Sequence, residues 1–140
     1  MRERGGLVLA TSSGLAFVPA SVASSVVQLG PIADVPGLPP PALGVALAEG
    51  RVATVISLSA TNTASTAVLC DIDGDLVAFV ADEIVAVGSF PTSPGGVMYG
   101  ATHVAELDAR GLYAELEGTL WAARAVRRAQ RRASMHGGEA

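Results

Sequence analysis

The strongest constraint on the fold is a series of short apolar runs separated by turn residues over the first 106 positions. Runs of this length, rich in valine and leucine, are typical of β-strands. Asp73-Gly74 lies between two of them and is the strongest short-range hairpin signal in the sequence. Successive strands without intervening helices favour an all-β barrel or sandwich. The valines of Ser21–Leu29 fit either a strand or a helical turn. The other predicted strands are Leu7–Ala10, Leu15–Val18, Leu43–Leu47, Arg51–Leu58, Thr66–Ile72, Asp75–Ala81, Glu83–Phe90 and Val97–Glu106.

Turn and loop residues divide these runs. Thr11–Gly14 and Glu49-Gly50 have turn composition, and each is predicted to close a hairpin. Pro31–Pro41 contains five prolines. Because proline excludes a helix interior or a central strand, this segment is predicted to be a shaped loop. Ser59–Ser65 is predicted to be a loop by composition, and Pro91–Gly96 a break between strands.

The pattern becomes helical near Leu107. Asp108 is a candidate N-cap for a helix that starts there or one turn later. Apolar residues then recur at helical spacing, at Leu112, Leu116, Leu120 and Ala123. The predicted division of the chain is a β domain over residues 1–113, an arginine-rich helix over 114–133 and a flexible tail over 134–140.

Five arginines gather near the C-terminus. They recur at i, i+3, i+4, i+7 and i+8, so a helix would place all five on one face. That face has two interpretations that both stay open. It can dock an acidic protein, an anionic membrane surface or nucleic acid, or it can be a solvated face that offsets an acidic body. The five residues are Arg124, Arg127, Arg128, Arg131 and Arg132.

Composition and charge exclude several classes of protein. With 50% hydrophobic and 16% charged residues, the 140-residue chain is not a disordered or solvating protein. A single cysteine, Cys70, excludes an internal disulfide and a cysteine-rich zinc site. Residues 1–123 carry four arginines and twelve acidic residues. This mildly acidic body argues against nucleic acid as a partner.

The sequence gives no sign of a membrane anchor. No apolar run approaches the roughly 18 residues that a membrane-spanning helix needs. The basic and apolar start resembles a secretory signal, but Thr11–Gly14 interrupts its apolar region too early. We therefore expect a cytoplasmic protein without a transmembrane segment.

No group of residues forms a recognisable catalytic or metal site. Asp71–Asp75 resembles the start of a calcium loop, but its glycine comes at the fourth position and not the sixth, and strands flank it. His103 and His136 lack the local carboxylate spacing of a metal site. Cys70 lies in an apolar strand and is expected to be a small buried side chain. The prediction is a protein that is not an enzyme and uses no metal, cofactor or small-molecule substrate.

Several segments, taken in order, resemble the CheW-like family, whose members are scaffold domains of bacterial chemotaxis and related two-component pathways. The resemblance covers roughly residues 7–113. Val35–Val45 resembles the family's proline-rich segment and the strand after it, and Leu76–Val87 resembles the strands that follow. The other matching segments are Leu15–Pro19 with Val22, Val26 and Val27 after it, Ala46–Gly50, Arg51–Leu58 and Val104–Asp108.

The sequence departs from the family pattern at polar positions. Glu49 stands where the family usually has arginine, which is a reversal of charge. Ser25 falls near a position often held by glutamate, Thr54 replaces a proline and Ser57 replaces an aspartate. Residues typical of the scaffold, such as Asp82, persist. A retained fold with altered or lost partner contacts would produce this pattern.

The resemblance implies an all-β fold of two small five-stranded barrels packed together, with a hydrophobic groove at their junction. It also implies a non-catalytic adaptor. One of its surfaces would meet the regulatory domain of a CheA-type histidine kinase, and another the tip of a chemoreceptor. If the matched segments make these contacts, the partner-binding residues are Val26, Leu29, Val45, Leu47 and Glu49. The alternative is a diverged barrel outside kinase signalling that docks an acidic partner through Arg124, Arg127, Arg128 and Arg131.

Overall fold

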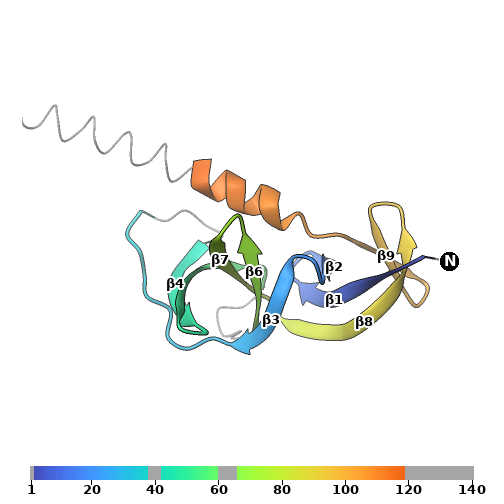
Figure 1. Cartoon of the computed structure of the whole chain (residues 1–140), viewed down its shortest axis with the longest axis horizontal. Coiled ribbons are helices and arrows are strands. Elements are labelled where there is room, and N and C mark those ends of the chain that lie inside the picture. Colours follow the sequence, from blue (N-terminus) through green and yellow to red (C-terminus); the bar gives the residue numbers. More distant parts are fainter. Residues whose placement is uncertain (1, 38–41, 60–65, 119–140) are drawn as a thin grey trace, which may run out of the picture.

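The computed structural model describes residues 2–37, 42–59 and 66–118, and they form two five-stranded sheets followed by one helix (Figure 1). The all-β prediction with two small five-stranded units and a C-terminal helix is therefore confirmed. In chain order the strands are β1 (Glu3–Thr11), β2 (Gly14–Pro19), β3 (Ala23–Gln28), β4 (Ala42–Ala48), β5 (Arg51–Ser57), β6 (Thr66–Ile72), β7 (Asp75–Val80), β8 (Glu83–Ser93), β9 (Gly96–Tyr99) and β10 (Thr102–Ala105).

The first sheet has the strand order β10-β9-β8-β1-β2 and curls so that its two edges meet. Phe17 of β2 forms a parallel bridge with Glu106, just after β10. The Leu107 amide also donates to the Phe17 carbonyl at 2.8 Å. Phe17 and Phe90 pack edge to face at 6.1 Å inside this sheet, a favourable geometry for aromatic rings. The interior is completed by Val8, Val97 and Val104.

The second sheet has the strand order β3-β6-β7-β5-β4 and also curls, almost into a barrel (Figure 1). Its pairings are antiparallel except for the parallel pair β5 and β7. The interior is unusually rich in alanine, because a small barrel has little room for side chains. The buried residues that fill it are Ala46, Ala48, Ala53, Val55, Ala67, Leu69, Leu76, Ala78 and Val80.

A third core, which we name the junction core, lies between the two sheets and under the helix. The strands β1, β6 and β7 supply it with side chains from the faces opposite to their barrel interiors. On β7, for example, Val77 and Phe79 face the junction core whereas Ala78 faces the barrel interior. Strands that are buried on both faces have continuous apolar runs in their sequence. The junction core contains Leu7, Leu9, Val18, Ile56, Val68, Cys70, Ile72, Val77, Phe79, Ala81, Ala109 and Leu116.

The C-terminal helix is described over residues 109–118. Asp108 is its N-cap, as predicted, because its carboxylate accepts a hydrogen bond from the Gly111 amide at 3.0 Å. Leu116 is buried in the junction core and Leu112 packs against it. The predicted division at residue 113 falls inside this helix, and Leu120 and Ala123 lie outside the described residues.

The hairpin turns agree with the sequence predictions. Asp73 and Gly74 have φ angles of 53° and 89°, and Glu49 and Gly50 have 52° and 78°. Two successive positive φ values define the type I′ turn, whose twist matches that of paired strands. The ambiguous segment Ser21–Leu29 contains a strand, β3. The described parts of the two predicted loops are irregular, apart from a bridge between Ala33 and Val45.

Two predictions near the end of the β domain are wrong. The predicted break at Pro91–Gly96 begins too early, because β8 continues to Ser93. Proline is tolerated in β8 because Pro91 is the last residue of this strand that pairs with β1. Pairing of β8 with β9 begins at the next residue, Thr92. The single strand predicted over Val97–Glu106 is two strands, because Gly100 adopts a φ of 61° and turns the chain.

Substitution of a junction-core residue should destabilise both sheets together. Phe79→Ala should lower the free energy of unfolding by about 3–5 kcal/mol, because it removes a fully buried ring. Denaturant unfolding with amide hydrogen exchange measures this change. Val87→Ala, at an exposed position, is the control and should change stability by less than about 0.5 kcal/mol. Loss of protection in β6 and β7 without loss in β1 would contradict a shared core.

Candidate protein-docking surfaces

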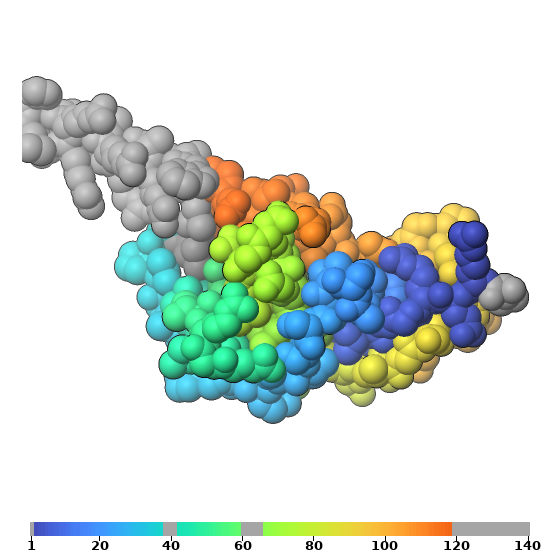
Figure 2. Space-filling view, viewed as in Figure 1, coloured from blue at the N-terminus to red at the C-terminus, as the bar shows by residue number. Residues whose placement is uncertain are grey.

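A groove runs between the two sheets, with β1 and β8 on one side and β3 on the other. We name it the junction groove. It has a volume of about 480 Å³, and its lining includes Gly5, Gly6, Ser25, Val26 and Val87. Val26 and Val87 are 43% and 72% exposed, respectively. In Figure 2, β3 (light blue) lies beside β1 (dark blue) and β8 (yellow). The groove therefore presents apolar side chains over a lining of small residues.

Glu49 contacts the wall of the junction groove. The Ser25 hydroxyl, which lines the groove, donates a hydrogen bond to the Glu49 carboxylate at 2.9 Å. This contact joins β3 to the β4–β5 turn and so connects the two edge strands of the second sheet. Ser25 and Glu49 are also two of the positions at which the sequence departs from the CheW-like pattern. The two residues that depart from the pattern are thus in contact with each other.

A second apolar surface lies on the β4–β5 hairpin, and we name it the hairpin patch. Leu47 and Val52 face each other across the hairpin and are 71% and 66% exposed. They line a hollow of about 380 Å³ together with Val45 and Pro31. No residue lines both this hollow and the junction groove. Exposed apolar side chains grouped in this way are typical of interaction sites.

The structure distributes the predicted partner-binding residues over both surfaces. Val26 lines the junction groove and Glu49 contacts its wall, whereas Val45 and Leu47 line the hairpin patch. Leu29 is half-buried and packs against the interior of the second sheet. The predicted residues Arg124, Arg127, Arg128 and Arg131 lie outside the described residues.

Sequence analysis did not identify Val87 and Val52 as surface residues. Both lie in apolar runs, in which almost every position looks equally suited to a core. Strand alternation could have suggested that some of these side chains face outward. It could not show which face of each strand a second sheet would cover.

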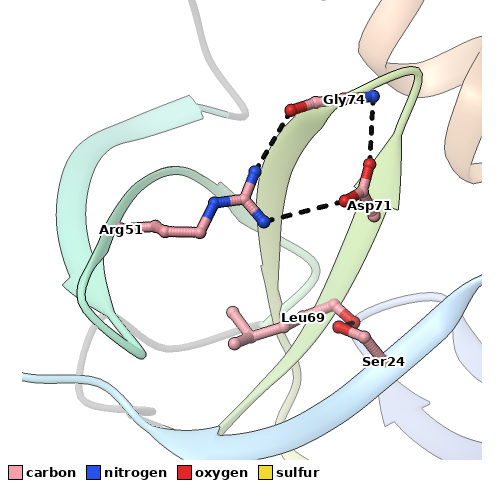
Figure 3. Close-up of polar contacts among 5 residues, drawn as sticks. All are labelled: Ser24, Arg51, Leu69, Asp71 and Gly74. Carbon is pink, nitrogen blue, oxygen red and sulfur yellow. Dashed lines mark hydrogen bonds and ion pairs between the residues drawn. The ribbon is translucent and has the colours of Figure 1, made fainter.

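The acidic β6–β7 turn forms hydrogen bonds and an ion pair with residues of the same chain (Figure 3). The Asp71 carboxylate accepts from the Gly74 amide at 3.0 Å and lies 3.7 Å from the Arg51 guanidinium. Arg51 also donates to the Gly74 carbonyl at 3.1 Å. Nearby on β3, the Ser24 hydroxyl donates to the Leu69 carbonyl at 3.1 Å. In the described parts of the chain, no three metal-ligating side chains gather at one place.

The same turn anchors the C-terminal helix. Arg110 forms an ion pair with Asp73 at 2.9 Å, and the Tyr113 hydroxyl donates to the Asp75 carboxylate at 3.0 Å. Burial, followed by the hydrogen bond to Asp75, raises the pKa of Tyr113 well above its usual range. The phenol therefore stays a donor to Asp75 throughout the ordinary pH range. The three aspartates of the turn thus contribute to structure.

His103 and Cys70 are also in structural environments, whereas His136 lies outside the described residues. His103 is exposed, and its Nε2 lies 2.8 Å from the Pro94 carbonyl, which is hydrogen-bond distance. Cys70 is fully buried in the junction core. Burial raises the pKa of its thiol to about 12. A thiol in this state is a poor nucleophile at neutral pH.

The comparisons with known proteins support the fold. The structure is similar to the crystal structure of the scaffolding protein TtCheW from Thermoanaerobacter tengcongensis, with a TM-score of 0.54 and 18% sequence identity. The match covers 61% of this chain and 64% of that chain, so it spans a little under two thirds of the solved protein. No family model matches the sequence, and no curated protein matches it. Within the described residues, no helix has the length and apolar character needed to cross a membrane.

The likeness to TtCheW establishes that this protein has a CheW-like fold. At 18% identity this similarity shows only the fold. The evidence for the docking surfaces comes from the residues that form them. Both surfaces are apolar and open, and neither contains a cluster of reactive groups. Their arrangement suits the binding of proteins.

The buried thiol gives a direct check on the structure. Cys70 should react with a thiol reagent at pH 8 only as fast as the protein unfolds, because the folded thiol is inaccessible and protonated. Its pKa is raised from 9.0 to about 12 on folding. Its contribution to stability is therefore complete below about pH 9 and decreases as the pH rises towards 12. Rapid labelling of the native protein at pH 8 would contradict a closed junction core.

Proposed function

We propose that this protein is a non-catalytic cytoplasmic adaptor that couples a receptor or another input protein to a CheA-type histidine kinase. The observation that carries the proposal is the pair of separate apolar surfaces on a CheW-like fold. An adaptor must hold two partners at once, and it therefore needs two sites that do not overlap. The junction groove and the hairpin patch meet this requirement because they share no lining residue.

The hairpin patch suits the kinase. It lies on the edge hairpin of the second sheet, where a partner barrel of similar shape can approach the ends of the strands. Leu47 and Val52 are mostly exposed, and burying each contributes about 1.5–3 kcal/mol of favourable free energy. Association itself costs at least several kcal/mol. A micromolar complex, near −8 kcal/mol, therefore needs contacts beyond these two side chains.

The junction groove suits the input protein. Its lining contains small residues such as Gly5 and Gly88, so that apolar side chains of a partner can enter it. Val26 and Val87 would then be covered by the partner. This is the arrangement of interaction hot spots, in which a few apolar residues in a hollow carry most of the binding energy.

Calorimetric titration with the regulatory domain of a CheA-type kinase from the same organism tests the proposal. We expect micromolar binding. Leu47→Asp should weaken it at least tenfold, because a carboxylate would be buried in an apolar contact. Val26→Asp is the matched control on the other surface and should leave the kinase affinity unchanged.

A triple change of Arg127, Arg128 and Arg131 to alanine separates this proposal from the arginine-rich alternative. The adaptor proposal expects the kinase affinity to stay within about twofold, because the contact is made by the hairpin patch. Absence of kinase binding at high protein concentration would refute the coupling function.

A further inference from the structure

The junction groove has an acidic residue in contact with its β3 side. Glu49 contacts the β3 side through Ser25, whose hydroxyl donates to its carboxylate at 2.9 Å. On the β1 side, the alternation of strand residues places Glu3 on the same face as Gly5 and Leu7. Gly5 and Leu7 both line the groove, and Glu3 is exposed. A ligand in the groove therefore lies beside the Glu49 carboxylate, whereas Glu3 lies two residues beyond Gly5 and does not line the groove.

Of the four described arginines, three are engaged away from the groove, and the fourth, Arg2, directly precedes Glu3 in the sequence. Arg4 pairs with Glu106, Arg51 with Asp71 and Arg110 with Asp73. Among the described residues, none of these ion pairs includes Glu3 or Glu49. Glu49 accepts its hydrogen bond from a neutral hydroxyl, so that no described residue forms an ion pair with its carboxylate. The groove consequently has a negative charge beside its β3 side, at Glu49.

The sign of this charge selects the occupant. Phosphate-bearing surfaces, such as nucleic acids and anionic membranes, would be repelled by the Glu49 carboxylate. A protein segment with apolar side chains and neighbouring lysines or arginines would fill the groove and complement its charge. We infer that the junction groove binds an apolar and basic protein segment, with Glu49 as its charge-selecting residue. This inference rests on the proposed function, in which the groove receives the input protein.

The backbone at Glu49 supports a fixed placement of this charge. Glu49 has a φ of 52° in a two-residue turn, a conformation that few residues other than glycine, asparagine and aspartate adopt readily. The turn geometry and the Ser25 hydrogen bond together limit where the carboxylate can lie. A charge held in place discriminates between partners better than one on a mobile side chain.

Selection from a phage-displayed library of random peptides tests the inference without a known partner. The full-length protein serves as bait, beside the variants Glu49→Arg, Val26→Asp and Asp34→Arg. Asp34 is exposed and lines neither surface, so Asp34→Arg is the control for an equal change in net charge. We expect the wild type and Asp34→Arg to enrich peptides with apolar residues flanked by lysine or arginine. Glu49→Arg should lose that basic preference and retain the apolar one.

The strongest peptide is then synthesised and titrated into each protein. Glu49→Arg should bind it about five- to tenfold more weakly at low salt, and the difference should shrink as salt is added. Asp34→Arg should bind within twofold of the wild type.

The outcomes distinguish failure of the groove as a docking site from failure of the charge inference alone. If no enriched peptide depends on Val26, the groove is not a docking site, and both the inference and this part of the proposed function fail. If peptides bind in a way that depends on Val26 but lack a basic preference, only the charge inference fails.

Sedimentation of the wild-type protein alone tests whether a second copy of the chain occupies the groove. Self-association that Glu49→Arg abolishes would assign the groove to the arginine-rich segment of a second copy and overturn an external partner.

Discussion

The structure depends on the burial of β6 and β7 on both faces. Side chains on one face fill the interior of the second sheet, and those on the other face form the junction core with β1 and the C-terminal helix. This arrangement fixes the two sheets against each other. The junction groove exists because β3 of one sheet then lies beside β1 and β8 of the other. A rigid junction core is therefore a condition for any ligand site between the sheets.

Local signals in the sequence predicted most of the strands and turns. Asp73-Gly74 and Glu49-Gly50 specify their turns through residues that tolerate a positive φ, and Asp108 caps the helix through its own side chain. The errors arose where tertiary pairing overrides local preference. Pro91 lies within β8 because its missing N–H falls at the change from one ladder to the other. The packing of two sheets came from the resemblance to CheW-like proteins, since apolar runs alone do not show which strands are buried on both faces.

The docking surfaces were predictable in part. Val26 and Leu47 lie in segments that match the family pattern, and both prove to be exposed. Val87 could not be distinguished from its buried neighbours, because exposure there depends on where the second sheet ends. The contact between Ser25 and Glu49 spans 24 positions of sequence. Each residue was identified as a departure from the family, but only the closure of the second sheet brings the two together.

The alanine-rich interior of the second sheet has a consequence for how such a protein can diverge. In a curled sheet, the size of the interior side chains sets the separation of the two edge strands. Alanine is already small, so that almost every substitution at Ala46, Ala53, Ala67 or Ala78 would widen the barrel. The edges β3 and β4 would move apart, and the carboxylate of Glu49 would move relative to Ser25. Substitution of these buried alanines would thus change which partner the groove recognises, even when every surface residue stays the same.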